Sequence, residues 1–257
     1  MCGRFTLMAT PDQVALFLSL TDLEDFPARY NIAPTQPILM VAAGHPQPPG
    51  SNLPDRIAML VRWGLIPRWA KDPKSLSLLI NARSETADER GTFKAAMRHR
   101  RALIPASGFY EWKTVDKTKQ PFFMRPRDGG LVAFAGLMET YADPNGSEID
   151  TGAILTTAAT PDIAHIHDRM PVVVAPRDFA RWLDCRTLEP RDVADIMQPP
   201  LPALFEAIPV SDLVNKVTNV GPEIQERVAV EVPPPPAPPK QSKPSRPPQD
   251  DDQFSLF

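Results

Sequence analysis

The chain has 257 residues, of which 42% are hydrophobic, so it can bury one substantial core and corresponds to one or two domains of average size. Its formal net charge of −3 gives no sign of a nucleic-acid-binding protein, and no apolar run approaches the roughly 18 residues of a membrane span. The sequence has no visible secretory signal, and its two cysteines exclude a disulfide framework or a four-thiolate zinc site, so we expect a soluble cytoplasmic protein.

The helical signals are few and short. Thr10, followed by Pro11, reads as an N-cap with proline in the first turn, which predicts a helix that ends at about Leu20. Further helices are expected at residues 92–100, 176–184 and 189–197, and the last should stop at Pro199.

Strand patterns dominate the rest of the first 228 residues. Runs of β-branched and apolar residues, broken by turn residues, predict strands at 37–43, 56–65, 78–82, 102–112, 121–125, 131–139, 152–157 and 172–175. Strands and helices do not alternate, which disfavours a doubly wound parallel sheet. We therefore expect one α+β domain over residues 1–228, built on an antiparallel sheet or barrel with a few short peripheral helices.

A basic segment lies within this domain. Residues 56–127 hold 16 Lys and Arg against 6 Asp and Glu, a local charge of +10, with aromatic residues between the cations. This composition suits single-stranded nucleic acid, since cations bind phosphates and rings stack on bases. A solvated basic face over core tryptophans is the alternative.

The composition changes after Val232. Nine of the 32 prolines lie between Pro233 and Pro248, in a stretch that cannot bury a core. We expect residues 229–257 to form a disordered tail. It ends in QFSLF, residues 253–257, whose apolar side chains indicate a short linear docking peptide.

Cys2 is the strongest candidate for chemistry. A small second residue permits removal of Met1, which would leave Cys2 with an α-amine and a thiol on adjacent carbons. Their ordinary pKa values, about 7.7–8 and about 8.5, leave both a nucleophilic fraction at neutral pH. The amine can condense with an aldehyde to an imine, and the thiol can then close an intramolecular thiazolidine ring.

Cys2 lies in the first of several motifs that succeed one another along the chain. They are MCGRF (1–5), YNIAPTQ (30–36), RWGLIPRWAKD (62–72), NARSET (81–86), RALIPASGFYEWK (101–113), AILTTAA (153–159), IHDRMPVVV (166–174) and VNKVTNVGPE (214–223). This set resembles the SRAP family of SOS-response-associated peptidases, or abasic-site-processing proteins. The resemblance implies binding to single-stranded DNA, capture of the ring-opened aldehyde of an abasic site by Cys2, and a stable DNA–protein crosslink that protects the lesion.

The resemblance also implies roles for individual residues. Cys2 matches the family nucleophile, Asn81 an active-site asparagine, Glu111 the catalytic glutamate and His167 the family histidine. Read without the family, Asn81 could be a turn or strand-end residue, Glu111 a buried ion-pair partner and His167 a satisfied core histidine. His165 lies in the same loop, and only the HDRMP register favours His167 over it.

A second set of positions matches family contacts to DNA. Arg4, Arg83 and Arg169 match phosphate contacts, and Thr156 matches a neighbouring loop position. Asn31 and Pro34 lie in the segment that approaches DNA. Trp69 either lines the DNA channel or belongs to the core.

The C-terminal QFSLF resembles the pentapeptide by which bacterial proteins bind the DNA sliding clamp, with Gln253, Leu256 and Phe257 as its contacts. We expect no metal or nucleotide cofactor, because no spacing resembles a zinc site, a P-loop or a dinucleotide fingerprint. Nothing in the sequence suggests an assembly, so we also expect a monomer. Two other functions stay open. One is an N-terminal-nucleophile cysteine peptidase or amidase that uses Cys2 against a carbonyl, and the other is a non-catalytic adaptor that binds through its tail.

Overall fold

A computed structural model of the chain describes residues 2–46, 48, 50–51, 55–143 and 145–229. The predicted tail, apart from Ala229, lies outside these residues, as do Gln253, Leu256 and Phe257. Strands predominate in the described part and its helices are short and peripheral, which confirms the expected α+β class. None of its helices is long and apolar enough to cross a membrane.

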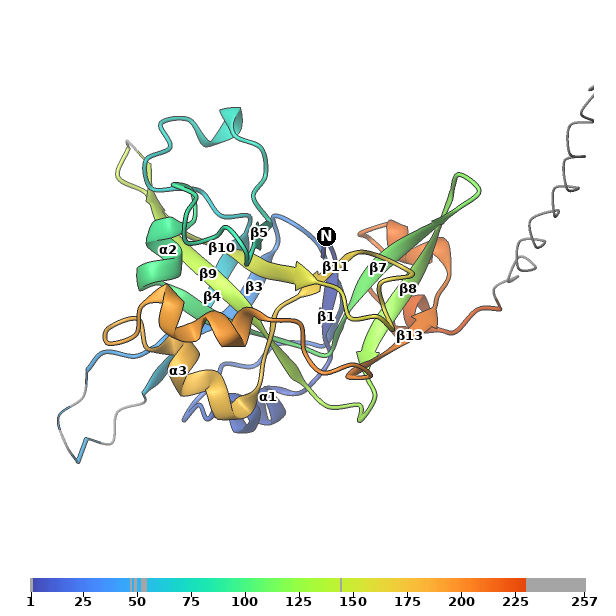
Figure 1. Ribbon diagram of the computed structural model, residues 1–257, viewed down its shortest axis with the longest axis horizontal. Helices are drawn as coiled ribbons and strands as arrows, with labels where there is room; N and C mark the ends of the chain where they lie inside the picture. Colours follow the sequence, from blue (N-terminus) through green and yellow to red (C-terminus); the bar gives the residue numbers. More distant parts are fainter. Residues whose placement is uncertain (1, 47, 49, 52–54, 144, 230–257) are drawn as a thin grey trace, which may run out of the picture.

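Five strands close into a barrel, which lies on the left in Figure 1. Around the ring they are β10 (Glu148–Ala158), β4 (Arg56–Trp63), β3 (Pro37–Ala43), β6 (Arg101–Ala106) and β9 (Val132–Ala142), which pairs with β10 again. All pairs are antiparallel except β4 with β10. The long connection between β4 and β10 allows this parallel pairing, which a hairpin would not.

The barrel interior holds the side chain of Met40 from β3 against glycines of β9 and β10. Met40 is fully buried and reaches Gly136 on β9 and Gly152 on β10. A Cβ atom on Gly136 would lie 2.5 Å from Cε of Met40, and one on Gly152 would lie 2.5 Å from its Sδ. The two glycines therefore make room for one large apolar side chain, and the interior is a packed core.

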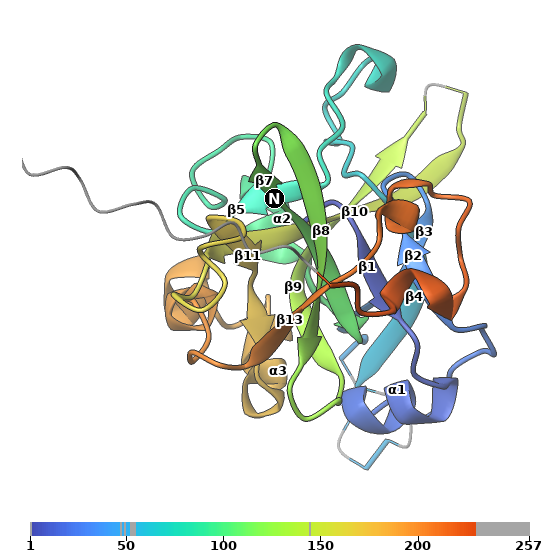
Figure 2. The same ribbon diagram turned by 90° about the vertical axis from the view of Figure 1, so that its right-hand side faces the viewer.

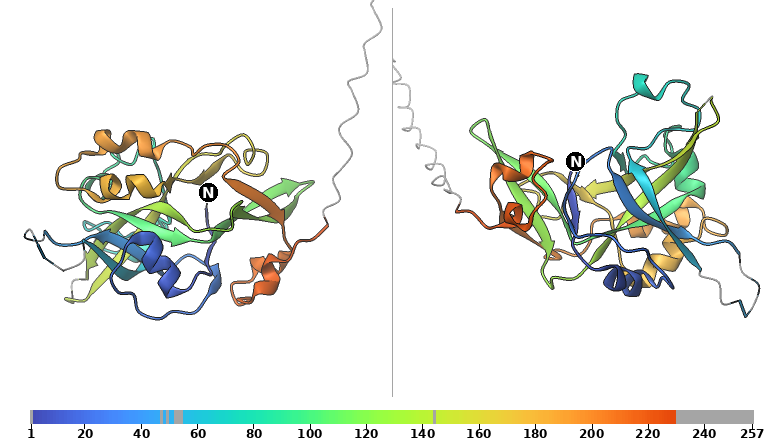
Figure 3. Two further views of the ribbon diagram at one scale, coloured as in Figure 1. Left: turned by 90° about the horizontal axis from the view of Figure 1, so that it is seen from below. Right: turned by 180° about the vertical axis from the view of Figure 1, so that it is seen from behind.

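A second sheet stands beside the barrel and extends away from it (Figures 2 and 3). In spatial order its strands are β13 (Phe205–Pro209), β8 (Thr118–Pro126), β7 (Gly108–Val115), β1 (Phe5–Leu7) and β2 (Arg29–Ile32). The start of the chain thus enters between the barrel and the β7–β8 hairpin.

The predicted strand over residues 102–112 is two strands, β6 and β7. The chain leaves the barrel at Ser107, whose backbone N–H donates to the carbonyl of Thr6 at 2.8 Å. Gly108 follows with φ 158°, and a Cβ there would lie 2.5 Å from the backbone oxygen of Met124. Residues 102–112 have high β propensity throughout, so the sequence predicts one strand there. The propensity of a segment does not say which strand it pairs with, and the change of sheet could not be predicted from it.

Three short strands flank the barrel. β5 (Asn81–Arg83) runs parallel to β10, β11 (Arg169–Pro171) pairs antiparallel with the end of β10, and β12 (Val173–Val174) pairs with β9. β5 overlaps the predicted strand at 78–82 and β12 lies within the one at 172–175, whereas β11 was not predicted. Their pairing brings residues 81–83, 156–158 and 169–171 together at one edge of the barrel.

The α-helices are α1 (Pro11–Leu18), α2 (Lys94–His99) and α3 (Phe179–Leu183). The predicted cap of α1 is confirmed: the hydroxyl of Thr10 accepts from the N–H of Gln13, whose side chain accepts from the N–H of Thr10. The predicted helix at 189–197 is a 3-10 helix. The 3-10 turns are η1 (Pro73–Ser75), η2 (Pro176–Asp178), η3 (Pro190–Met197), η4 (Asp212–Asn215) and η5 (Pro222–Gln225).

Candidate functional site

Cys2 and Asn81 meet although 79 positions separate them in the chain. The side-chain amide Nδ2 of Asn81 donates a hydrogen bond of 2.8 Å to the carbonyl oxygen of Cys2. Asn81 begins β5, and its pairing opposite Ile154 of β10 fixes its position. The Oδ1 atom of Asn81 is buried and has no hydrogen-bond partner among the described residues, so it can accept a bond from a bound molecule.

The thiol of Cys2 is fully buried, and its Sγ lies 3.8 Å from the carbonyl oxygen of Arg4. Burial raises the pKa of the Cys2 thiol well above its usual range, and the nearby charge of Glu111 raises it further. In this state the thiol keeps its proton at neutral pH. The thiolate fraction expected from the ordinary pKa of cysteine therefore does not apply to the buried Cys2 thiol.

Glu111 and His167 form the ionisable pair of the site. Glu111 lies on β7 and is 3% exposed; its Oε2 is 3.9 Å from Nε2 of His167, which lies in the loop that precedes β11. Burial raises the pKa of Glu111, while a positive charge on His167 would lower it. A carboxyl group whose pKa is raised toward neutrality can both donate and accept a proton.

The backbone fixes the tautomer of His167. The N–H of Arg169 donates to Nδ1 of His167 at 3.0 Å, so the ring proton of the neutral imidazole lies on Nε2, which faces Glu111. The carboxylate of Asp168 also lies 3.1 Å from Nδ1. It is 86% exposed and can rotate into solvent, whereas the amide cannot, so the amide determines the tautomer.

Arg4 and Asn31, both predicted to face DNA, are bonded to the protein. NH1 of Arg4 donates to Oδ1 of Asn31 at 2.6 Å and to the carbonyl of Val214 at 2.8 Å. Nδ2 of Asn31 donates to the carbonyls of Lys216 and Asn219 at 3.1 and 2.8 Å. The two side chains therefore hold the 214–219 loop against the second sheet, and Asn31 is 4% exposed.

Arg83, Thr156 and Arg169 lie together on β5, β10 and β11. Thr156 is opposite Arg83 in the β5–β10 register, and one NH2 group of Arg169 donates to the carbonyl of Thr156. Arg83 is exposed, while Thr156 is fully buried. The guanidinium of Arg169 makes a bidentate pair with Glu85, at 2.5 and 2.8 Å.

Pro34 and Trp69 lie on turns outside this cluster. Pro34 is half-buried in the tight turn between β2 and β3, where Thr35 has φ 72°. Trp69 is 61% exposed in the connection between β4 and β5, whereas Trp63 is fully buried and donates to the carbonyl of Ile80. The basic segment thus contains both a core tryptophan and one available for stacking.

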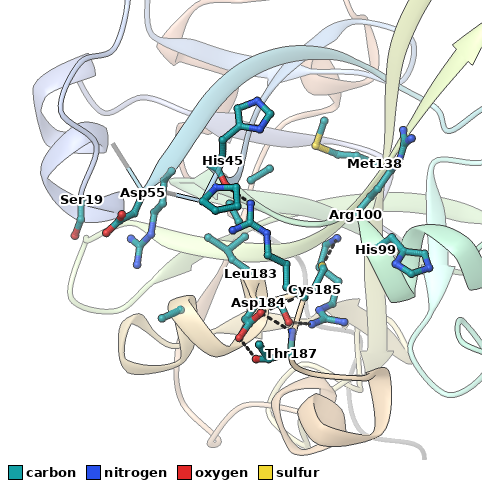
Figure 4. A pocket seen from close by; sticks show the side chains of 18 of the residues that line it. Ser19, His45, Asp55, His99, Arg100, Met138, Leu183, Asp184, Cys185 and Thr187 are labelled. Carbon is teal, nitrogen blue, oxygen red and sulfur yellow. Dashed lines mark hydrogen bonds between the residues drawn. The ribbon is translucent and has the colours of Figure 1, made fainter. Parts of the chain in front are cut away.

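A hollow of about 930 Å³ lies elsewhere on the barrel, beside α3 (Figure 4). None of the four predicted catalytic residues lines it. Its arginines already bond to the protein: Arg101 donates to the carbonyls of Trp182 and Asp184, Arg186 donates to Gly44, and Arg100 pairs with Glu139. This hollow is therefore separate from the candidate site.

Sequence reasoning did not single out Glu85. It stands two residues after Arg83 in the NARSET motif, and its partner Arg169 is 84 positions away. The motif itself was the available signal, but only the pairing of β10 with β5 and β11 brings the two side chains together.

The fold and the cluster define one class of protein: a small β-barrel that holds a cysteine near the chain start against an asparagine, beside a buried glutamate paired with a half-buried histidine. The family model described as SOS response associated peptidase (SRAP) matches residues 1–217, and this chain belongs to that family. It is 39% identical over 230 residues to the abasic site processing protein YoqW of Bacillus subtilis, covering 88% of this chain and 99% of that one. It is 32% identical over 240 residues to the abasic site processing protein YedK of Escherichia coli, covering 89% and 100%.

Solved structures have the same fold. A Bacteroides thetaiotaomicron protein superimposes with a TM-score of 0.73 at 21% identity, over 89% of this chain and all of that one. A Bordetella bronchiseptica protein gives 0.70 at 25% identity, over 82% and 100%. At these identities the likeness concerns the fold, and it agrees with the barrel and second sheet described above.

Proposed function

We propose that this protein recognises abasic sites in single-stranded DNA and captures them covalently through Cys2 once Met1 is removed. The observation that carries the proposal is the hydrogen bond from Asn81 to the Cys2 backbone, beside buried Glu111 and its half-buried partner His167. The relatives named abasic site processing proteins support the substrate.

The reaction begins at the amine of Cys2, because burial keeps the thiol protonated. The amine adds to the aldehyde of the ring-opened deoxyribose, and loss of one water gives an imine. The thiol sulfur then adds to the imine carbon, its proton moves to the nitrogen, and a thiazolidine ring forms. Ring closure is intramolecular, so the Cys2 sulfur has to move only a short distance to reach the imine carbon.

Glu111 and His167 supply the proton transfers. Imine formation removes a proton from the attacking amine and delivers one to the departing hydroxyl, so one group has to act in both directions. Glu111 suits this task because its pKa is raised by burial, and Nε2–H of His167 can donate to the sugar oxygen that opens. Oδ1 of Asn81 can accept from a sugar hydroxyl.

Intact mass spectrometry tests the proposal. The purified protein should lack the mass of Met1, and incubation with an abasic oligonucleotide should add the full oligonucleotide mass minus one water. Cys2→Ala should give no stable adduct, and Cys2→Ser should stop short of the thiazolidine. Retention of Met1 together with normal adduct formation would refute the proposal.

A peptidase or amidase is the second candidate, and the family's name, SOS response associated peptidase, favours it. In that reaction the Cys2 sulfur would attack a carbonyl with the α-amine as base. The raised pKa of the buried thiol opposes this role. Turnover of an amide substrate without any adduct to abasic DNA would favour the peptidase.

The C-terminal peptide extends the proposal to the replication fork. We assign Gln253, Leu256 and Phe257 to a groove on the DNA sliding clamp, with the proline-rich stretch as the tether that leaves the domain free to engage DNA. Deleting residues 253–257 should abolish clamp binding in a pull-down or calorimetric titration while crosslinking in solution continues. Equal clamp binding by the truncated and the full-length chain would overturn the assignment.

A further inference from the structure

The salt bridge between Glu85 and Arg169 lies beside the acid–base pair. Both oxygens of Glu85 accept from the guanidinium of Arg169, at 2.5 and 2.8 Å. This interaction lowers the pKa of Glu85, so the pair is ionised at neutral pH. The Arg169 side chain is 14% exposed and that of Glu85 is 49% exposed, which makes Glu85 the outer partner.

Arg169 is also bonded on its inner side. NH2 of Arg169 donates to the carbonyl of Thr156, and its Nε is buried without a partner among the described residues. The fork of the guanidinium is thus filled by protein acceptors on β10 and on the turn that follows β5. A bidentate pair of this kind fixes both distance and orientation of the guanidinium plane.

The backbone of the same residue determines the state of His167. The N–H of Arg169 donates to Nδ1 and thereby keeps the ring proton on Nε2, 3.9 Å from Glu111. Arg169 begins β11 and pairs with Ala158 of β10, so the amide moves only if this end of β11 moves, and the salt bridge with Glu85 is a second contact that holds this end. The contacts therefore run from Glu85 through the side chain and backbone of Arg169 to the imidazole of His167.

We propose that Glu85 is a positioning residue: it anchors Arg169 so that the Arg169 amide holds His167 in its Nε2–H tautomer, facing Glu111. Glu85 itself does not touch the reacting atoms. This inference deepens the proposed function and rests on it, because the proton delivered from Nε2 is used in the capture of an abasic site.

The test separates the rate of capture from the affinity for DNA. Glu85→Gln removes a negative charge near the path of the phosphates, so the affinity for undamaged single-stranded DNA should stay equal or increase. The crosslinking rate constant at saturating abasic DNA should nevertheless fall about tenfold, since a small displacement of a catalytic group costs up to ~100-fold. Arg169→Lys, which keeps the charge and loses the fork, should show the same fall in rate.

The control is Glu89→Gln, which removes an exposed carboxylate from the same segment and should leave the rate unchanged. If Glu85→Gln leaves the crosslinking rate constant at saturating DNA unchanged, the positioning role is overturned. A fall in crosslinking that weaker DNA binding fully explains would overturn it as well. Melting curves identify any variant that has lost its fold; in that case Glu85→Asp, which keeps the charge but shortens the reach, should give an intermediate rate.

A second readout does not depend on capture. The ¹⁵N chemical shifts of the His167 ring should report Nδ1 without a proton in the wild type and a mixture of tautomers in Glu85→Gln. If the wild-type chain forms no adduct but the tautomer still depends on Glu85, the proposed function fails and the positioning role stands. If the wild type forms the adduct and the His167 tautomer is the same in the wild type and in Glu85→Gln, only the positioning role fails.

Discussion

At the scale of single residues, the candidate site combines reactivity with a cost in stability. Glu111 is 3% exposed, and burial raises its pKa above the ordinary value of 4.5. The folded state therefore binds this proton more tightly than the unfolded chain does. As the pH rises above about 4.5, ionisation of Glu111 costs folding free energy, which is typical of groups kept for catalysis.

Replacing Glu111 by Gln should therefore separate activity from stability. We expect the crosslinking rate to fall at least ~100-fold, because the proton shuttle is lost. The Tm at pH 7.5 should rise by about 2–4 °C for each ~1 kcal/mol recovered. The gain should vanish as the pH falls toward 4, where Glu111 is protonated in both folded and unfolded chains; calorimetry across this range measures it. A variant less stable than wild type at pH 7.5 would contradict the burial argument.

The two thiols should be unreactive in the folded protein. Burial raises the pKa of both Cys2 and Cys185, and it outweighs the hydrogen bond from the N–H of Arg101 to the Cys185 sulfur, which lowers the pKa of that thiol. Because the thiolate is the reactive form, titration with a disulfide reagent at pH 7.5 should show almost no fast reaction. Both thiols should react at once in denaturant. A fast phase from the native protein that Cys2→Ala removes would show that the Cys2 thiol is activated after all.

At the scale of elements, local patterns predicted most strands but not their partners. The strands at 37–43 and 56–65 were predicted because they are long and β-branched. β1, β2, β11 and β13 were missed because they have three to five residues and contain polar residues such as Thr6 and Glu206. Such strands are held by pairing, and the partner of β1 lies about a hundred positions away on β7.

The packing of the barrel gives a prediction at this scale. Gly152→Ala should destabilise the protein by about 1–3 kcal/mol, because the new methyl would meet Met40, Val61 and the carbonyl of Leu137. Gly91→Ala, where nothing lies within 4 Å, is the control and should be close to neutral. Urea unfolding measures both free energies.

Adding Met40→Ala to Gly152→Ala should cost less than the sum of the two single changes, since Met40 is the main obstacle to the new methyl. Additive costs in this cycle would show that the methyl is accommodated without displacing Met40.

At the scale of the whole molecule, the charge is divided between two parts of the chain. The basic segment at 56–127 carries a local charge of +10, so the remaining residues carry −13. The barrel places Arg83 of this segment, exposed, next to Thr156 and Arg169 and near the Cys2 cluster. A protein with net charge −3 can therefore still attract phosphates to one of its edges.

This arrangement predicts a salt-dependent affinity for single-stranded DNA. The logarithm of the association constant should fall linearly with the logarithm of salt concentration, with about −0.7 per phosphate contact. Arg83→Ala should reduce the slope by about that amount and weaken binding to any sequence. Arg177→Ala, an exposed arginine outside the basic segment, should leave the slope unchanged. An equal effect of the two variants in fluorescence anisotropy would remove Arg83 from the interface.

The sequence alone determined the class of fold, the cap of α1, the family resemblance and the four candidate catalytic residues, because these depend on residue type, local spacing and motif order. The tertiary structure decided the closure of the barrel, the change of sheet at Ser107, the burial of the Cys2 thiol and the pairing of Glu85 with Arg169. Each of these depends on contacts between residues far apart in the chain. Local propensity carries no information about such contacts, and burial, which sets the pKa values of the site, exists only once they form.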